Sequence, residues 1–218
     1  MSLGVEAVVF DIGETIVDES RLWCSWADWL HVPRLTLLGL IGAGIERGAQ
    51  PGEVLRELLP GIDIAAERRR RREAGDPDDF TAADLYPDVQ PALSALQESG
   101  YRVGIAGNQP EAWEDFLREV PLPQPLACCG SSGTWRISKP HAGFFQRICD
   151  ELSLPAEGIA YVGDRLDYDV LPALDAGMVA VHVRRGPWGW RHATRPGIER
   201  ATLRIDSLNE LPEALARL

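Results

Sequence analysis

Residues 8–15 of the chain read VVFDIGET, and this stretch decides the fold. Its apolar half is short and rich in valine, which predicts a strand that is buried on both faces. Asp11 ends the apolar run, and open α/β sheets bind ligands where such strands end. Gly13 permits a tight turn or a close backbone approach, and Thr15 supplies a hydroxyl. The stretch predicts a nucleophile or metal site, although a helix-capping aspartate would fit the same residues.

Three later stretches complete a recognisable set: RVGIAGN at 102–108, SKPH at 138–141 and VGDRLDYD at 162–169. Together with residues 8–15 they resemble, in order and approximate spacing, the four motifs of the haloacid dehalogenase-like (HAD) superfamily. The resemblance spans nearly the whole chain. It implies an α/β fold with a Rossmann-like parallel sheet, helices on both faces of the sheet, and an inserted α-helical cap.

The pattern of the remaining residues agrees with that fold class. Strand-like runs are expected at 101–106, 126–129, 159–162 and 178–183, and helices at 90–99, 142–152, 170–176 and 207–217. Strands that alternate with helices indicate a mostly parallel sheet. Residues 184–190, which read RRGPWGW, are expected to form a loop that folds its tryptophans over the domain edge; the alternative is a loop that stacks on a ligand.

Residues 20–80 carry no strand signal, and four helices are expected at 18–30, 33–46, 51–59 and 64–74. By the resemblance, residues 17–83 are the helical cap, and residues 1–16 and 84–218 are the core domain. Caps of this superfamily generally cover the site and select the substrate. The tryptophans of the segment are expected in its core, and the five arginines at 68–72 on a solvated face.

Composition excludes some partners. The net charge of −11 argues against a nucleic-acid or anionic-membrane partner, because phosphate backbones are bound by Lys and Arg. No apolar run approaches the roughly 20 residues that span a bilayer, and no signal peptide is visible. The four cysteines have neither metal-ligand spacing nor the density of a disulfide scaffold, so a reduced, cytoplasmic protein is expected.

The resemblance also implies roles for particular residues. Asp11 would be the nucleophile that forms an aspartyl-phosphate, and Lys139 would balance the charge of the nucleophile and the phosphate. The Mg²⁺ ligands would be Asp11, Asp164, Asp169 and the backbone carbonyl of Gly13. Gly107, Asn108 and Thr15 would bind the phosphate of a small phosphorylated substrate.

Two motifs depart from the superfamily pattern. Phosphatases of this superfamily usually carry a second aspartate, a general acid and base, where Gly13 stands. Without such a group turnover commonly falls by about 10²–10⁴, so slow hydrolysis is expected. Glu14 is adjacent and carboxylic, and is the candidate to replace that aspartate. In the second motif, Gly107 and Asn108 stand where a serine or threonine is usual.

Three functions therefore stay open at this stage. The first is a Mg²⁺-dependent phosphatase. The second is a protein that binds phosphate with little or no turnover, which the altered motifs favour. The third is a metal-independent haloacid dehalogenase, because dehalogenases of this superfamily also lack the second aspartate. Against the third stands the acidic cluster at 164–169, whose carboxylates would repel Asp11 without a cation.

Overall fold

The structure is a computed structural model that describes residues 4–111 and 113–218. The chain divides into two compact units, Met1–Asp18 with Thr81–Leu218, and Glu19–Phe80. Residues 1–3, which open the predicted core domain, lie outside the described part. Within the described residues, no helix is long and apolar enough to cross a membrane. None of the four cysteines, all in the described part of the chain, is joined in a disulfide.

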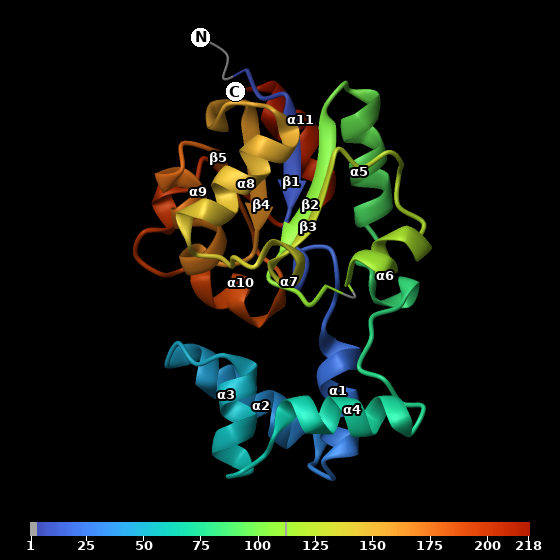
Figure 1. Ribbon diagram of the computed structural model, residues 1–218. Coiled ribbons are helices and arrows are strands. Elements are labelled where there is room, and N and C mark those ends of the chain that lie inside the picture. Colours follow the sequence, from blue (N-terminus) through green and yellow to red (C-terminus); the bar gives the residue numbers. More distant parts are fainter. Residues whose placement is uncertain (1–3, 112) are drawn as a thin grey trace. The chain divides into compact units, whose positions relative to one another are not determined.

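The larger unit is built on a six-stranded parallel sheet, as predicted from the alternating pattern (Figure 1). Its strands lie in the order β3-β2-β1-β4-β5-β6. Their bounds are β1 Ala7–Phe10, β2 Arg102–Gly107, β3 Cys128–Ser131, β4 Ile159–Gly163, β5 Val179–Val183 and β6 Leu203–Ile205. The strand that opens the chain therefore lies inside the sheet, between β2 and β4, with Phe10 paired to Ile105 and Val162.

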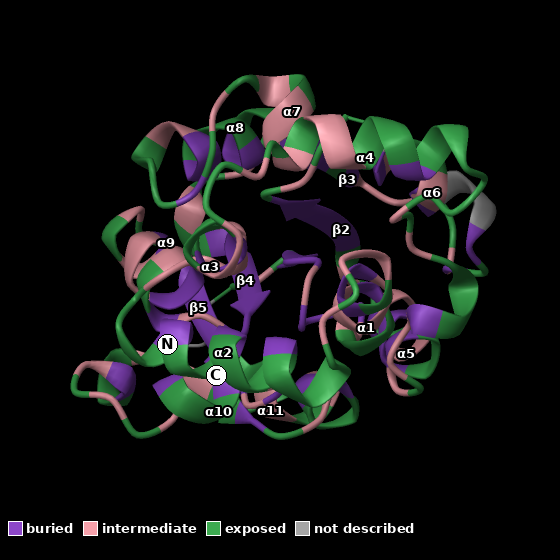
Figure 2. Ribbon diagram, turned by 90° about the horizontal axis from the view of Figure 1, so that it is seen from below, coloured by how far each residue is buried: buried purple, intermediate pink, exposed green. Residues whose placement is uncertain are grey.

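Helices cover both faces of this sheet. Their bounds are α5 Val89–Glu98, α6 Trp113–Glu119, α7 Ser132–Trp135, α8 Ala142–Leu152, α9 Leu171–Asp175, α10 Gly186–His192 and α11 Leu211–Ala216. Helices α8 and α9 pack together over one face, and α5 and α11 pack together over the other (Figure 1). Figure 2 shows β4 and β5 buried between helices whose outer surfaces are exposed. A sheet covered on both faces explains why its strands read as continuous apolar runs.

The core on the α8 side shows how the sequence fills this space. Phe144, Phe145 and Ile148 of α8 are fully buried against Val9 and Tyr161 of the sheet. The rings of Phe145 and Tyr161 meet edge to face, with their centroids 5.2 Å apart. Burying an aromatic or large aliphatic side chain contributes about 1.5–3 kcal/mol, so this cluster alone anchors α8 to the sheet.

Several predicted elements needed correction. The predicted 184–190 loop is mostly the helix α10, because Trp188 is buried and draws the segment onto the domain; Trp190 remains 61% exposed. The predicted 170–176 helix begins earlier, with a π-helical turn at Leu166–Val170. The final helix starts at Leu211, after a 3₁₀ turn, and the short edge strand β6 was not predicted.

The smaller unit is helical, with α1 Ser20–Trp29, α2 Arg34–Glu46, α3 Pro51–Leu58 and α4 Ile64–Glu73. Trp26 is buried in its core. The expectation that all five arginines at 68–72 lie on a solvated face was wrong for one of them: Arg71 is fully buried. Its guanidinium lies 5.0 Å from the centroid of the Trp26 ring and donates to the Asp76 carbonyl, so the buried charge is compensated.

Candidate active site

The site residues gather at one edge of the sheet because parallel strands all end on the same side. β1 is followed at once by Asp11 and β4 by Asp164, and these strands are neighbours. β2, on the other side of β1, ends at Gly107. A Cβ at residue 107 would lie 2.6 Å from Asp11 Oδ1 and 2.9 Å from Ile12 Cδ1, so a larger residue would displace these side chains. The structure thus brings the predicted first, second and fourth motifs together.

Lys139, from the third motif, contacts carboxylates of the first and fourth motifs. Its Nζ lies 2.6 Å from Oδ1 of Asp11 and 2.6 Å from Oδ1 of Asp169, and all three side chains are buried. Burial alone would lower the pKa of Lys139, but the two carboxylates raise that pKa well above its ordinary value. The ammonium is therefore a permanent charge beside Asp11.

Asn108 holds the backbone of Lys139 by two hydrogen bonds. Its side-chain amide donates to the Lys139 carbonyl over 3.0 Å, and its side-chain oxygen accepts from the Lys139 backbone N–H over 2.9 Å. The residue predicted to bind phosphate thus uses both ends of its amide to tie the loop after β2 to the loop that carries Lys139. Its phosphate-binding role stays a prediction.

Three carboxylates form an acidic cluster. Oxygens of Asp11, Asp164 and Asp169 all lie within 4.8 Å of one another. Burial and the neighbouring charges of Asp169 and Asp11 hold the pKa of Asp164 well above its usual range. Burial raises the pKa of Asp169 to about 6, against the opposing charge of Lys139. Ionised together, the three carboxylates exceed the single ammonium by two negative charges, which suits a divalent cation.

Asp164 carries the most direct sign of a missing ligand. Its Oδ2 is buried and has no hydrogen-bond partner among the described residues. Both oxygens of Asp169, in contrast, are used: Oδ1 accepts from Lys139 and Oδ2 from the backbone N–H of Arg165. Because an unsatisfied buried carboxylate is costly, an Mg²⁺ ion fits this donor set of oxygens.

The loop after β4 is held in place by aromatic rings. The guanidinium of Arg165 lies between two of them, 3.9 Å from the Tyr168 centroid and 3.8 Å from the Trp188 centroid. It also pairs with Asp167 over 2.8 Å. The π-helical turn Leu166–Val170, an element often found at functional sites, then brings Asp169 back towards Lys139.

The loop after β1 holds the remaining predicted residues. Gly13 is partly exposed and pairs with Val17 in an isolated bridge. Thr15 is fully buried, and its hydroxyl has no hydrogen-bond partner among the described residues. Glu14 is buried as well, and its Oε2 accepts a 2.5 Å hydrogen bond from the Tyr86 hydroxyl. The roles predicted for Gly13, Glu14 and Thr15 stay predictions.

Comparison with known proteins agrees with this geometry. A family model described as haloacid dehalogenase-like hydrolase matches residues 5–177. The chain belongs to the haloacid dehalogenase-like hydrolase family. The match includes all four motifs and the whole helical unit.

Curated relatives of this HAD hydrolase include two phosphatases and a dehalogenase. A glyceraldehyde 3-phosphate phosphatase of Methanopyrus kandleri is 28% identical, over 84% of this chain and 86% of the relative. A phosphoglycolate phosphatase of Cupriavidus necator is 27% identical, over 99% of this chain and 95% of the relative. An (S)-2-haloacid dehalogenase of Burkholderia cepacia is 29% identical, over 63% of this chain and 58% of the relative.

A solved structure confirms the fold of the HAD hydrolase. It is the crystal structure of a predicted phosphoglycolate phosphatase from Haemophilus somnus, with a TM-score of 0.71, 18% identity and coverage of 98% of each chain. At this identity the likeness concerns the fold alone.

The motifs did not reveal every residue at this edge of the HAD core. Tyr86, Asp88 and Arg185 form a polar group beside the loop after β1, in which Arg185 pairs with Asp88 and donates to the Thr15 carbonyl over 2.9 Å. The sequence patterns assigned no site role to Tyr86 or Asp88, and they placed Arg185 in a loop. The one available signal was the presence of two arginines next to tryptophans in an acidic chain.

Proposed function

We propose that this HAD hydrolase is a Mg²⁺-dependent phosphatase that acts on a small phosphorylated metabolite through an aspartyl-phosphate on Asp11. The observation that carries the proposal is the buried Asp11–Lys139–Asp169 arrangement beside Asp164, whose Oδ2 lacks a partner among the described residues. The names of the relatives, glyceraldehyde 3-phosphate phosphatase and phosphoglycolate phosphatase, support a small phosphate ester as substrate. We also propose that residues 17–83 are the cap of the family.

In this proposal Asp11, Asp164 and Asp169 and the Gly13 carbonyl would hold the Mg²⁺ ion. Bound there, the ion would neutralise negative charge on the phosphate and on the carboxylates. Lys139 contributes a second positive charge, fixed against Asp11 Oδ1 at 2.6 Å. Backbone N–H groups after Asp11 and at Gly107 would bind phosphate oxygens.

The first chemical step uses Asp11 as nucleophile. A carboxylate oxygen of Asp11 forms a bond to phosphorus while the bond from phosphorus to the ester oxygen breaks. The departing oxygen takes a proton from water or from a nearby acid, for which Glu14 is the candidate, and leaves as the alcohol. In the second step a water oxygen attacks phosphorus, the bond to Asp11 breaks, and inorganic phosphate leaves. The Lys139 ammonium, 2.6 Å from Asp11 Oδ1, balances negative charge on Asp11 and on the phosphate.

Dehalogenation is the second candidate because one relative is an (S)-2-haloacid dehalogenase. The acidic cluster favours the phosphatase, since three buried carboxylates with one ammonium leave an excess of negative charge that a metal-free reaction does not require. Phosphate binding with little turnover is the third candidate, motivated by Gly13 and by the altered second motif.

Product release separates the three functions. Phosphate release from glyceraldehyde 3-phosphate, phosphoglycolate and p-nitrophenyl phosphate is measured with and without Mg²⁺, and halide release from 2-chloropropionate is measured alongside. The expected result is phosphate release that requires Mg²⁺ and is abolished by Asp11→Asn, with no halide release. Asp150→Asn, on the exposed surface of α8, is the matched control and keeps wild-type activity. Halide release without metal, or phosphate release that survives Asp11→Asn, contradicts the proposal.

A further inference from the structure

We propose that residues 185–192, which are α10 and the arginine before it, position the two loops that would hold the Mg²⁺ ion. This role rests on the proposed phosphatase function, because the residues concerned act through the metal ligands and not on the substrate. None of the four motifs includes the segment. Its contacts with the loop after β4 and with the loop after β1 carry the proposal.

Two residues of α10 pack against the start of the loop after β4. Trp188 is buried, and the guanidinium carbon of Arg165 lies 3.8 Å from the centroid of its ring. The next residue, Gly189, brings the helix backbone to Asp164, because a Cβ at residue 189 would lie 3.3 Å from Cβ of Asp164. The same Cβ would lie 2.9 Å from the Val183 carbonyl oxygen. α10 thus lies against a proposed metal ligand and against the residue that follows it.

His192, at the end of α10, fixes the backbone of the same loop. Its side chain is fully buried, and its Nδ1 accepts a 2.9 Å hydrogen bond from the backbone N–H of Leu166. Leu166 lies two residues after Asp164 and begins the π-helical turn that contains Asp169. Because a buried N–H requires an acceptor, this bond fixes how the chain leaves Asp164 and enters the turn.

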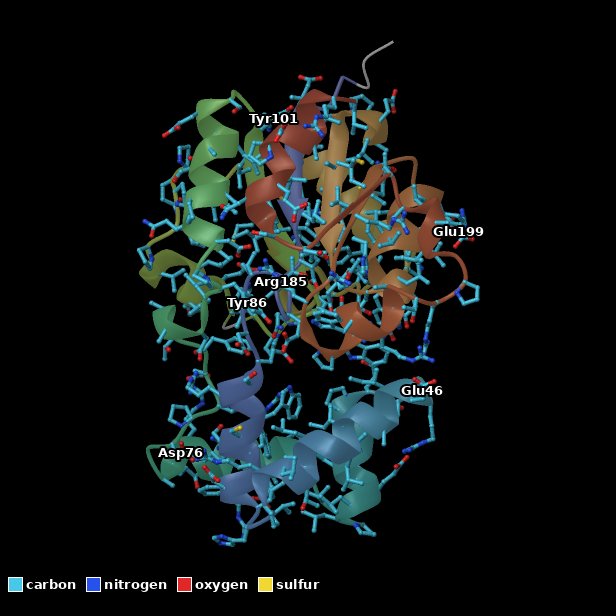
Figure 3. All side chains as sticks on the ribbon, turned by 180° about the vertical axis from the view of Figure 1, so that it is seen from behind. Glu46, Asp76, Tyr86, Tyr101, Arg185 and Glu199 are labelled. Carbon is cyan, nitrogen blue, oxygen red and sulfur yellow. The ribbon has the colours of Figure 1, made fainter. Side chains whose placement is uncertain are left out.

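The arginine before α10 contacts the other loop. Arg185 donates to the Thr15 carbonyl over 2.9 Å and is held by its ion pair with Asp88. Its guanidinium carbon also lies 4.3 Å from the centroid of the Tyr86 ring, and Figure 3 shows these two residues next to one another. Thr15 follows Gly13, whose carbonyl is a proposed Mg²⁺ ligand, by two residues. Residues 185–192 therefore contact both loops that carry proposed ligands.

The two loops are far apart in the sequence, yet they would have to place their oxygens around one ion. Mg²⁺ requires a nearly ideal octahedron with distances of about 2.0–2.1 Å, so a small shift of one loop against the other weakens its binding. Groups that hold metal ligands in place commonly contribute about 10–100-fold to metal affinity. Arg185, Trp188 and His192 are positioning residues in this sense, and their loss should weaken Mg²⁺ binding.

The test measures the dissociation constant of Mg²⁺ by calorimetry on the full chain, without substrate. His192→Leu removes the acceptor for the Leu166 N–H, whereas His192→Asn keeps an acceptor oxygen at the place of Nδ1. Trp188→Leu removes the ring that packs on Arg165, and Arg185→Met removes the bond to the Thr15 carbonyl. Trp190→Leu, on the same helix but largely exposed, is the matched control for Trp188→Leu.

We expect His192→Leu to raise the dissociation constant of Mg²⁺ by about 10–100-fold, and Trp188→Leu and Arg185→Met to change it in the same direction. His192→Asn should bind Mg²⁺ more tightly than His192→Leu, and Trp190→Leu should bind it like wild type. Leu215→Ala, in the core between α11 and the rest of the larger unit, controls for stability. It should lower Tm and leave the dissociation constant unchanged, because it touches neither loop.

Unchanged Mg²⁺ affinity in His192→Leu and Trp188→Leu overturns the positioning role, and so does an equal loss of affinity in Leu215→Ala, which would trace the effect to stability alone. Trp188→Leu and Arg185→Met decide the question if His192→Leu does not fold. The proposed function fails separately, through wild type that binds Mg²⁺ but releases no phosphate. Wild type that binds no Mg²⁺ overturns the proposed metal site and the positioning role together.

Discussion

Replacing Asp164 with asparagine separates the metal proposal from a purely structural role of the acidic cluster. The substitution keeps the size of the side chain and removes its negative charge. Asp164 Oδ2 is buried without a partner among the described residues, and leaving such a group unsatisfied costs about 1–3 kcal/mol. The new amide can donate to the carboxylates of Asp11 or Asp169, whose oxygens lie within 4.8 Å. Without metal, Asp164→Asn should therefore be more stable than wild type.

The expected size follows from chain length. In a protein of 218 residues, 1 kcal/mol shifts Tm by about 2–4 °C, so the metal-free variant should melt roughly 2–12 °C above wild type. The folded-state pKa of Asp164 is raised, so the stability contributed by its proton is present at low pH and is lost as pH rises through that pKa. The advantage of the variant should accordingly be larger at pH 7.5 than at pH 4.5.

Mg²⁺ should narrow the difference in Tm between the two proteins, because it stabilises only wild type. At a concentration 100 times its dissociation constant, a ligand stabilises the folded state by about 2.7 kcal/mol, or about 5–11 °C here. Wild type should show this shift in thermal melts and bind Mg²⁺ by calorimetry, whereas Asp164→Asn should show neither. Asp175→Asn, an exposed aspartate on α9, is the control and should respond to Mg²⁺ like wild type. Equal Mg²⁺ responses in wild type and Asp164→Asn would refute the ligand set, and a metal-free variant less stable than wild type would refute the electrostatic reasoning.

Two further variants test the groups around Asp11. Lys139→Met should abolish phosphate release. It should also lower the free energy of unfolding without metal by about 3–5 kcal/mol, measured by thermal or urea unfolding, because Asp11 and Asp169 stay buried without their shared cation. Unchanged stability would mean that the ion pair is not formed. Gly13→Asp, assayed by kcat/KM on an alkyl phosphate, should raise the rate by up to about 10²–10⁴, because it supplies the carboxyl group that position 13 lacks. No gain, together with a Glu14→Gln variant as inactive as Asp11→Asn, would mean that Glu14 already transfers the proton and that Gly13 does not make the enzyme slow.

Short contiguous sequence patterns predict much of the fold of this protein. The run Val8–Phe10 followed by Asp11 predicted a buried strand that ends in a carboxylate, and the same pattern recurs before Asp164. Strands alternating with helices predicted the parallel sheet, and a parallel sheet brings the ends of its strands to one edge. Local patterns suffice there because each strand carries its own burial signal and its own terminal residue.

The partners of those residues were decided by tertiary structure. Nothing near Lys139 in sequence indicates that Asp169, 30 residues away, shares its ammonium with Asp11, or that Tyr86 bonds Glu14 across 72 residues. The prediction of a loop at 184–190 was wrong. Two arginines, a proline and two glycines are typical of a loop, but burial of Trp188 against the domain favours a helix there. Burial and pairing depend on which segments meet in space, and a chain read residue by residue does not contain that information.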